Sequence, residues 1–466
     1  MRDANLDPDF LISRGARVLV LGLGRSGTAA ARFLLRRGAK VVGSDENPAA
    51  LGSRPVSLLV ERGMRIEPSP ESAHVEWAIV SPGISNESTV VKALRRRSVP
   101  IADELDLASR LVGGPIVAVT GTNGKSTTTA LVARMLEAAG NSVFCGGNLA
   151  PGRPLSAALL MGRKDYYVVE VSSFQLERCR WLKPKVAVIL NITVDHLNRN
   201  GTLRRYADCK LGILDRQHED DYAVLNHDDP LVSAARKRGK GEKHFFSMRR
   251  GRMDACLVNG SLQAGDQQVL PASQVRLPGA HNIQNCLAAI AAARLLGVGL
   301  PSIRRTLKTF VGLPHRLEHV RRLHGVDYIN SSMTTNPAAG ARSLEAVVMG
   351  RQRPKSGGAR RRRVILIAGG REKALPTAEY VQAMKKYATW VLLTGESSGR
   401  LARELGVRGF HRFDVLADLR TALARARAKA QAGDAVLFAP GFASFDQFRD
   451  FEARGVAFRQ EVRKLD

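Results

Sequence analysis

The sequence predicts an α/β protein built of three doubly wound domains, of which the first and the last are Rossmann-like. Three stretches support this prediction, beginning at residues 17, 115 and 361. Each opens with a continuous apolar run that is typical of a buried parallel strand, and helical patterns separate it from the next such run. At 466 residues the chain can hold two or three cores. We expect domains at residues 1–103, 104–313 and 314–466.

The first stretch reads RVLVLGLGRSGTAAARFLLRRGAKVVGSDENP and predicts a strand, a glycine turn, a helix and a second strand. Gly22, Gly24 and Gly27, with Asp45 after the second strand, form a complete dinucleotide fingerprint. The glycines let backbone amides approach a diphosphate at the start of a helix, and the aspartate can accept hydrogen bonds from a ribose. Any nucleotide diphosphate fits this pattern, NAD included. Glycines kept only for helix–strand packing are the alternative.

The second stretch, PIVAVTGTNGKSTTTALVARMLEAAG, contains a shortened phosphate loop. A full P-loop has a glycine six positions before its lysine, where this chain has Val119. The chemistry is nevertheless complete. Gly121 and Gly124 free the backbone to surround phosphate oxygens, Lys125 brings a cation to the β/γ end, and Ser126 can bind Mg²⁺. We therefore expect a central P-loop ATPase domain.

Polar groups interrupt or end the strands that follow this loop. Glu170 lies within YYVVEVSSF, where a buried carboxylate is costly unless it is paired or bound to metal. His196 follows VAVILNITVD, at the carboxyl end of a strand, where open sheets hold ligands. Together with Ser126 these side chains could hold Mg²⁺. For His196 alone, an ordinary structural imidazole is the alternative.

The third stretch, RRRVILIAGGREK, is followed by the apolar runs ATWVLLTGE and DAVLFAPG with helical patterns between them. These runs predict the parallel strands of the C-terminal Rossmann-like domain.

Charge and cysteine content indicate which partners the protein binds and in which compartment it works. The chain has 71 Lys and Arg against 43 Asp and Glu, a net charge of +28, which favours phosphorylated partners. Two basic runs, at 236–243 and 351–363, contain glycines and no aromatic residue, so we interpret them as solvated loops and expect no obligate nucleic acid. Five cysteines without a C-x-x-C pair, no signal-peptide pattern and no membrane span indicate a cytoplasmic protein, which we expect to be a monomer.

The ordered motifs of the whole chain resemble those of the Mur ligases, and within them the branch that adds D-glutamate. The matching segments are VLGLGRSG, SPGIS, VTGTNGKSTTT, GGNLA, VVEVSSFQLE, NITVDHLNR, YADCK, LNHDDP, GAHNIQNCLAA, HRLEHV, TNPAA and FAPGFASFDQFRDFEARG. The resemblance implies that ATP and Mg²⁺ drive amide formation between UDP-N-acetylmuramoyl-L-alanine and D-glutamate, through an acyl phosphate and a tetrahedral intermediate.

The resemblance also implies roles for individual residues. The catalytic set would be Lys125, Glu170, His196 and Lys210, with Lys210 carbamylated. Metal would be held by Ser126, Glu170, His196 and the Lys210 carbamate. ATP would contact Gly121, Thr122, Asn123, Gly124, Lys125, Ser126, Thr127, Asn285 and Arg316. The UDP-linked substrate would contact Gly24, Arg25, Ser26, Asp45, Ser81, Gly83 and Asn148, which assigns the first fingerprint to UDP. The incoming amino acid would contact Thr335, Lys373, Ser444, Phe445 and Phe451. Core packing is the alternative for the two phenylalanines, and a solvated helix lysine is the alternative for Lys210.

The sequence departs from the D-glutamate branch where that branch reads Asn-Asp-Ser-Lys-x-Thr-Asn, because Ser331 and Met333 replace the acid and the lysine. An acceptor other than D-glutamate, such as L-glutamate, is therefore an alternative. So is another ligase of the superfamily, of the folylpolyglutamate synthase type. A nicotinamide dehydrogenase would explain residues 22–45 alone, and a nucleic-acid binder would rest on the charge alone.

Overall fold

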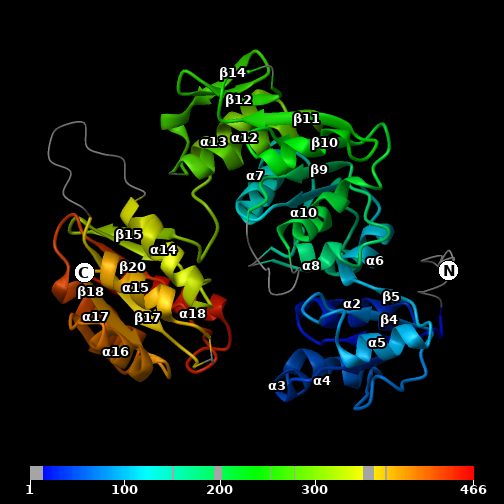
Figure 1. The fold of residues 1–466 in the computed structure, drawn as a ribbon, viewed down its shortest axis with the longest axis horizontal. Helices are drawn as coiled ribbons and strands as arrows, with labels where there is room; N and C mark the ends of the chain where they lie inside the picture. The colour runs from blue at the N-terminus through cyan, green and yellow to red at the C-terminus, as the bar shows by residue number, and fades with distance from the viewer. Residues whose placement is uncertain are drawn as a thin grey trace. The chain divides into compact units, whose positions relative to one another are not determined.

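The protein is described here from a computed structural model that covers residues 14–149, 152–193, 202–251, 253–277, 279–349, 362–372 and 375–466. These residues form three sheets, each flanked by helices (Figure 1). The chain divides into two compact units, one of residues 1–276 with 280–310 and one of residues 277–279 with 311–466. The first two sheets belong to the first unit, and the third sheet belongs to the second.

The first sheet has five parallel strands in the order β3-β2-β1-β4-β5. Their bounds are β1 Arg17–Leu21, β2 Lys40–Ser44, β3 Arg65–Ile66, β4 Trp77–Val80 and β5 Ile101–Ala102. Helices α2 Arg25–Arg36, α3 Pro48–Leu51, α4 Arg54–Glu61 and α5 Thr89–Arg96 connect them. The strand order reverses at β1, and open α/β sheets bind ligands at such a point. The glycine turn that follows β1 is therefore well placed for a ligand.

The second sheet has nine strands in the order β14-β13-β12-β11-β10-β9-β6-β8-β7. Its parallel strands are β6 Ile116–Thr120, β7 Val143–Gly147, β8 Tyr166–Glu170, β9 Val186–Ile189, β10 Tyr222–Asn226, β11 Glu242–Ser247 and β12 Ala255–Val258, and two antiparallel strands, β13 Ser261–Ala264 and β14 Gln267–Pro271, extend it. The helices that matter below are α7 Lys125–Ala138, α8 Ser173–Leu176, α10 Leu203–Leu211, α12 Ala280–Leu295 and α13 Leu300–Thr309. Strand β6 lies between β8 and β9, so the carboxyl ends of all three meet at the phosphate loop.

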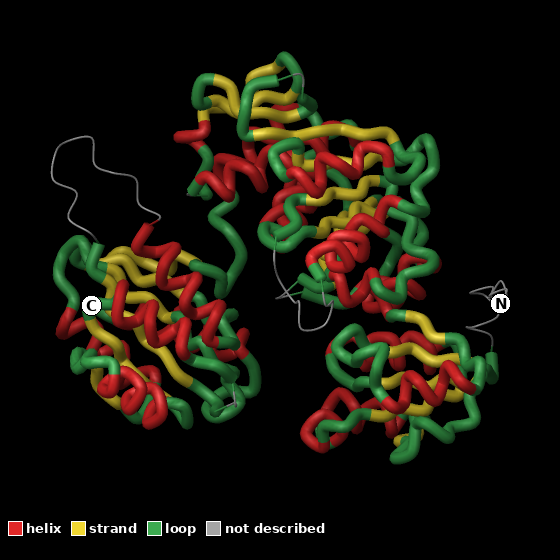
Figure 2. The backbone as a smooth tube through the Cα atoms, viewed as in Figure 1, coloured by secondary structure: helices red, strands yellow, loops and turns green. Residues whose placement is uncertain are grey.

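The third sheet is seen as a group of yellow strands with red helices beside them (Figure 2). Its order is β15-β16-β20-β17-β18-β19, and among the described strands of this sheet β15 alone is antiparallel to its neighbour. Its strands are β15 Glu318–Leu323, β16 Val326–Asn330, β17 Val364–Gly369, β18 Trp390–Thr394, β19 Phe413–Val415 and β20 Ala435–Phe438. Its helices are α14 Pro337–Met349, α15 Ala378–Tyr387, α16 Ser398–Val407, α17 Leu419–Lys429 and α18 Phe451–Lys464. The strands β17 and β20 are buried throughout, as their apolar sequences require.

A seam joins the first two sheets within the first unit. Helix α6 Glu104–Leu111 and the 3₁₀ helix η1 Leu155–Leu160 pack together, and α2 of the first sheet packs on η1. Leu107 at this seam is completely buried. The expected α/β class with three sheets is confirmed, whereas the domain boundaries near residues 103 and 313 remain predictions.

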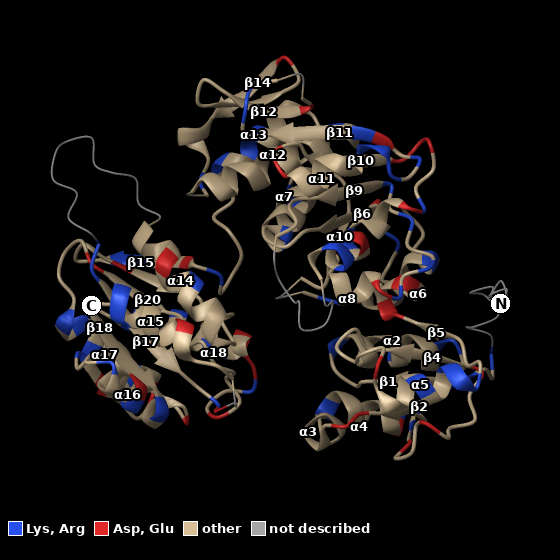
Figure 3. Cartoon of the chain, viewed as in Figure 1, with Lys and Arg blue, Asp and Glu red and all other residues tan. Residues whose placement is uncertain are grey.

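Lys and Arg residues occur on helices and loops around all three sheets (Figure 3). The positive charge is thus spread over the surface, and the basic residues form no single stripe in this view. In the described part of the chain, every helix is too short or too polar to cross a membrane.

Candidate active site

The phosphate loop joins β6 to the first turn of α7. Gly124 precedes Lys125, the first residue of that helix, and has a left-handed backbone with φ of 86°. A Cβ atom at Gly124 would lie 2.2 Å from Oδ1 of Asn285 on α12, so a side chain has no space there. The loop thus passes closely over a buried amide, and it leads into a 14-residue helix whose first N–H groups have no carbonyl partner within the helix.

Asn191, two residues beyond the end of β9, holds the phosphate loop in place. Its carbonyl accepts a 2.8 Å hydrogen bond from the Thr122 N–H. Its side chain accepts a 2.8 Å bond from the Asn123 N–H and donates a 3.1 Å bond to the Asn123 carbonyl. The sequence interpretation gave Asn191 no role. The available signal was a polar residue at the end of the apolar run VAVIL, which forms a strand next to the loop.

Two lysines converge on one backbone carbonyl. Lys125 Nζ donates to the carbonyl oxygens of Gly121 and Thr122, both at 2.9 Å. Lys210 Nζ, from α10, donates to the same Gly121 oxygen at 2.9 Å, although that side chain is only 1% exposed. The Lys210 ammonium also lies 4.6 Å from the centre of the Tyr206 ring. Two ammonium groups this close repel each other, and a bound polyanion would relieve that repulsion.

Glu170 ends β8 beside the loop, and its carboxylate is 4% exposed. One oxygen accepts a 3.2 Å hydrogen bond from the side chain of Asn148, which follows β7. The other oxygen is buried and has no hydrogen-bond partner in the described structure. A buried carboxylate oxygen without a partner is unfavourable unless a cation binds it, so this position suits Mg²⁺. Ser126, on the first turn of α7, is also buried.

A cavity of about 310 Å³ connects these groups with the first sheet. It is lined by Pro82, Gly83, Lys125, Asn148, Ser172, Ser173, Phe174, Tyr206 and Lys210. Four of these residues were predicted from the sequence. Gly83 and Asn148 were expected to contact the UDP-linked substrate, and Lys125 and Lys210 were expected in the catalytic set. Ser172, Ser173 and Phe174 received no role from the sequence, although Ser172 and Gln175 form a capping box that marks this turn.

The glycine turn after β1 has the shape that its fingerprint predicts. Gly22 has φ of 89°, and a Cβ atom there would lie 2.6 Å from Cβ of Ser81. The Asp45 carboxylate accepts hydrogen bonds from the N–H of Leu23 at 2.6 Å and from the N–H of Asn47 at 2.8 Å. Asp45 therefore holds the turn itself. The start of the next helix, α2, is where a diphosphate would bind. Gly24 and Arg25 are exposed there, and Ser26 is partly exposed.

The remaining predicted ATP contacts lie in different places. Asn285 packs beneath the loop and is 5% exposed. Thr127 is buried in the first turn of α7. Arg316 lies in the second compact unit and is partly buried.

The predicted amino-acid contacts also lie in the second unit. Ser444 is 2% exposed, whereas Thr335 is partly buried and Phe451 begins α18. Phe445 is 64% exposed, so core packing does not explain it.

The structure accounts for the replaced acid and lysine in the same unit. Ser331 is 2% exposed, and its hydroxyl forms a 3.1 Å hydrogen bond with the hydroxyl of Ser343. Met333 donates its N–H to the carbonyl of His315 at 3.1 Å. A buried aspartate at residue 331 would need a nearby cation, such as a lysine at residue 333. The hydroxyl pair of Ser331 and Ser343 is neutral and needs none, so the loss of the acid is consistent with the loss of the lysine.

Two predicted residues, His196 and Lys373, lie outside the described residues. Within the described ranges, no three His, Cys, Asp or Glu side chains form a cluster that could hold a metal ion. Of the four predicted metal ligands, Glu170 is the one described residue that is a His, Cys, Asp or Glu. A search for clusters of those residue types therefore does not test the predicted ligand set, which remains a prediction.

Comparisons with known proteins agree with this geometry. Residues 119–293 match the Mur ligase middle domain, and residues 315–442 match the Mur ligase, glutamate ligase domain. A UDP-N-acetylmuramoylalanine–D-glutamate ligase of Pelotomaculum thermopropionicum is 39% identical over 459 residues, covering 96% of this chain and 98% of the relative. One of the same name from Koribacter versatilis is 36% identical over 464 residues, covering 97% and 98%.

Solved structures agree at the level of the fold. The MurF ligase from Thermotoga maritima in complex with ADP superposes with a TM-score of 0.55 at 20% identity, covering 98% of this chain and 97% of that one.

Proposed function

The chain belongs to the Mur ligase family, and from this premise we propose that it joins D-glutamate to UDP-N-acetylmuramoyl-L-alanine in the cytoplasm at the expense of ATP. One observation supports the proposal most directly, namely that the side chains of Lys125 and Lys210 meet at the Gly121 carbonyl, near a buried Glu170 oxygen without a described partner. Lys125 would bring positive charge to the phosphates, and Glu170 with a carbamylated Lys210 would hold a metal ion beside them. The relatives named above have this activity in their names and align along nearly the whole chain.

The chain's residues suit the chemistry of an acyl-phosphate ligase. The carboxylate of the UDP-linked substrate attacks the γ-phosphorus of ATP, which forms an acyl phosphate and releases ADP. The amine of glutamate then attacks the acyl carbon, and inorganic phosphate leaves as the amide forms and a proton is lost. The protein contributes chiefly position and positive charge. Lys125 and the N–H groups of the first turn of α7 would hold the β- and γ-phosphates, and Asn191 would keep the loop before them in place.

Magnesium fits the described residues at one point, which is the buried Glu170 oxygen. We propose that Glu170 and Ser126 hold Mg²⁺ together with His196 and a carbamylated Lys210. Bound there, the ion would neutralise phosphate charge during transfer.

A different acceptor is the second candidate, and the neutral Ser331–Ser343 pair favours it. This change near the predicted amino-acid contacts could alter which stereoisomer is accepted, with L-glutamate as the specific alternative.

Phosphate release from ATP and UDP-N-acetylmuramoyl-L-alanine tests the proposal, with D-glutamate, L-glutamate, L-lysine and meso-diaminopimelate compared as acceptors. We expect D-glutamate to give the highest kcat/KM. The Lys125→Ala variant should release no phosphate yet bind the UDP-linked substrate nearly as well as the wild type. Full activity in that variant, or turnover with no amino acid of the panel, would refute the assignment.

A further inference from the structure

The loop of residues 81–86 carries a β-turn that faces the cavity. The N–H of Ile84 donates to the carbonyl of Ser81 at 3.0 Å, which closes the turn around Pro82 and Gly83. The N–H of Ser81 donates to Leu21 at the end of β1, at 2.9 Å. Pro82 and Gly83 line the cavity that Lys125 and Lys210 also line. The position of this turn therefore determines one wall of the proposed reaction site.

Arg178 holds both ends of that turn from the second sheet. Its Nη1 donates to the Ser81 carbonyl at 3.1 Å, and its Nη2 donates to the Ile84 carbonyl at 2.5 Å. Its Nε donates to the side chain of Asn86 at 2.9 Å. The Arg178 residue is 6% exposed. The planar guanidinium is essential to this arrangement, because three fixed donors reach three acceptors of one loop at once.

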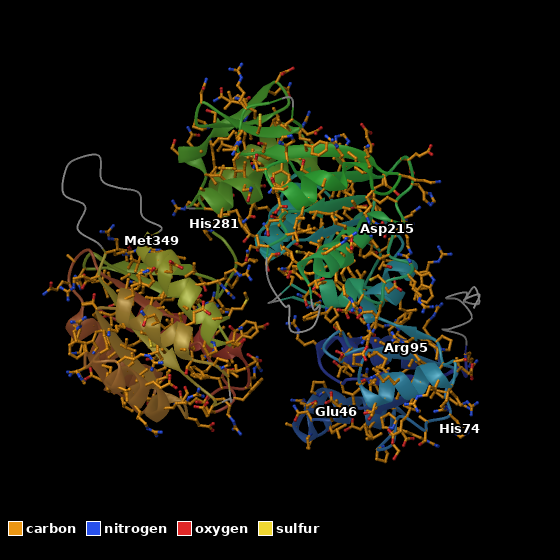
Figure 4. All side chains as sticks on the ribbon, in the orientation of Figure 1. Glu46, His74, Arg95, Asp215, His281 and Met349 are labelled. Carbon is orange, nitrogen blue, oxygen red and sulfur yellow. The ribbon has the colours of Figure 1, made fainter. Side chains whose placement is uncertain are left out.

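The segment that carries Arg178 also carries Glu170. Glu170 ends β8, and the capping box of Ser172 and Gln175 then fixes the short helix α8 just before Arg178. Asn86 also accepts a 3.0 Å hydrogen bond from Arg95, which belongs to helix α5 beside the first sheet. Arg95 is labelled in Figure 4. The 81–86 loop is thus held by its own sheet on one side and, on the other, by the segment that bears the proposed metal-binding carboxylate.

We propose that Arg178 is a positioning residue for the UDP-linked substrate, because it sets the 81–86 turn at a fixed place relative to Glu170 and Lys125. This inference rests on the proposed function, which places the substrate at Ser81 and Gly83. Arg178 acts through the turn and needs no contact with the substrate. Without the Arg178 guanidinium, the 81–86 loop loses three of its hydrogen bonds to the segment that follows β8. The turn is then held less firmly, and the substrate carboxylate loses its alignment with the γ-phosphate.

The test compares Arg178→Met, which keeps the aliphatic stem, with Arg178→Lys and with Arg96→Met as a matched control. Arg96 is the last residue of α5 and is exposed. By titration calorimetry, we expect Arg178→Met to weaken binding of UDP-N-acetylmuramoyl-L-alanine at least tenfold and to leave ATP binding within twofold of the wild type. Arg178→Lys should recover part of the loss, and Arg96→Met should match the wild type. A purely structural role would lower the fraction of competent protein while leaving the dissociation constant unchanged, and that result would overturn the proposal.

Hydrogen exchange of the Ile84 amide provides a measurement that needs no ligand. In the free protein we expect this amide to exchange at least tenfold faster in Arg178→Met than in the wild type or Arg96→Met, because the turn loses the hydrogen bonds that Arg178 donates to it. Equal exchange would refute the inference. A wild-type protein that fails to bind the UDP-linked substrate would count against the proposed function, while the exchange rates would still decide whether Arg178 positions the turn.

Discussion

At the scale of single residues, Lys210 is the most unusual group of the proposed site. Its ammonium is almost fully buried, with a backbone carbonyl and a tyrosine ring as neighbours. Carbamylation would convert this ammonium into an anion with a carboxylate-like tip, which suits a metal site next to Glu170.

The carbamate predicts a specific pattern of rescue. Lys210→Ala should be inactive, because the arm that reaches the Gly121 carbonyl is lost. A short carboxylic acid added to this variant should restore part of the ligase rate by placing a carboxylate where the carbamate tip would lie. The measurement is the rate of phosphate release as a function of added acid. Wild-type rates in the variant without any acid would remove the carbamate role.

Gly124 offers a second test of the loop. Gly124→Ala should weaken ATP binding at least tenfold, because the new Cβ atom would lie 2.2 Å from Asn285 Oδ1. Gly140→Ala is the matched control, since Gly140 has a similar φ of 93° but no atom within 4 Å of the point that a Cβ atom would occupy. Both variants should lose about 1–2 kcal/mol of stability from backbone strain. ATP affinity that falls equally in both would show that the contact with Asn285 is unimportant.

Sequence patterns pointed to Lys125 and Glu170 of the candidate site and missed residues that bond to the backbone of other segments. Lys125 and Glu170 were predictable because a lysine after glycines, or a carboxylate inside a strand, has few structural explanations. Asn191 and Arg178 were not, since both bond to backbone atoms of distant segments. Any residue can supply such atoms, so the sequence holds no matching partner to recognise.

At the scale of elements, the start of α6 holds a buried acidic group at the seam between the first two sheets. Burial raises the pKa of Glu104 to about 7, although hydrogen bonds from Ser156 and Ser26 oppose this shift. The Ser156 N–H donates to the carboxyl at 2.5 Å. Burial and the neighbouring Glu104 also raise the pKa of Asp103, and burial raises that of Asp106.

The raised pKa of Glu104 predicts a loss of stability with rising pH. The unfolded chain releases this proton near its ordinary pKa of 4.5, whereas the folded chain retains it up to about 7. The contribution of this group to stability is therefore greatest below pH 4.5 and falls as the pH rises to 7, by about 3 kcal/mol. Urea unfolding at pH 5 and pH 8 should show a smaller loss for Glu104→Gln than for the wild type. Parallel losses in the two proteins would contradict this assignment.

The elements themselves were predictable where they are buried on both faces. β6, β17 and β20 read as apolar runs and form parallel strands. The antiparallel extension β13–β14 and the edge strand β15 were not specified by the sequence interpretation. β15 has the sequence EHVRRL, and none of its residues is fully buried, so it lacks the apolar run that marks an interior strand.

At the scale of the whole molecule, one nucleotide-driven reaction accounts for the arrangement of the predicted sites. The phosphate loop and the predicted UDP contacts belong to the first compact unit, and the predicted amino-acid contacts belong to the second. The net charge of +28 agrees with three anionic reactants, and the basic residues are distributed over all three sheets (Figure 3).

Isotope transfer tests the central claim most directly. UDP-N-acetylmuramoyl-L-alanine labelled with oxygen-18 in its terminal carboxylate would be incubated with ATP, Mg²⁺, D-glutamate and the wild-type protein, and the products analysed by mass spectrometry. We predict one labelled oxygen in the inorganic phosphate, one ADP for each amide formed and no label in the nucleotide. Release of unlabelled phosphate with amide formation, or label appearing in AMP, would contradict an acyl phosphate formed at the Lys125 loop.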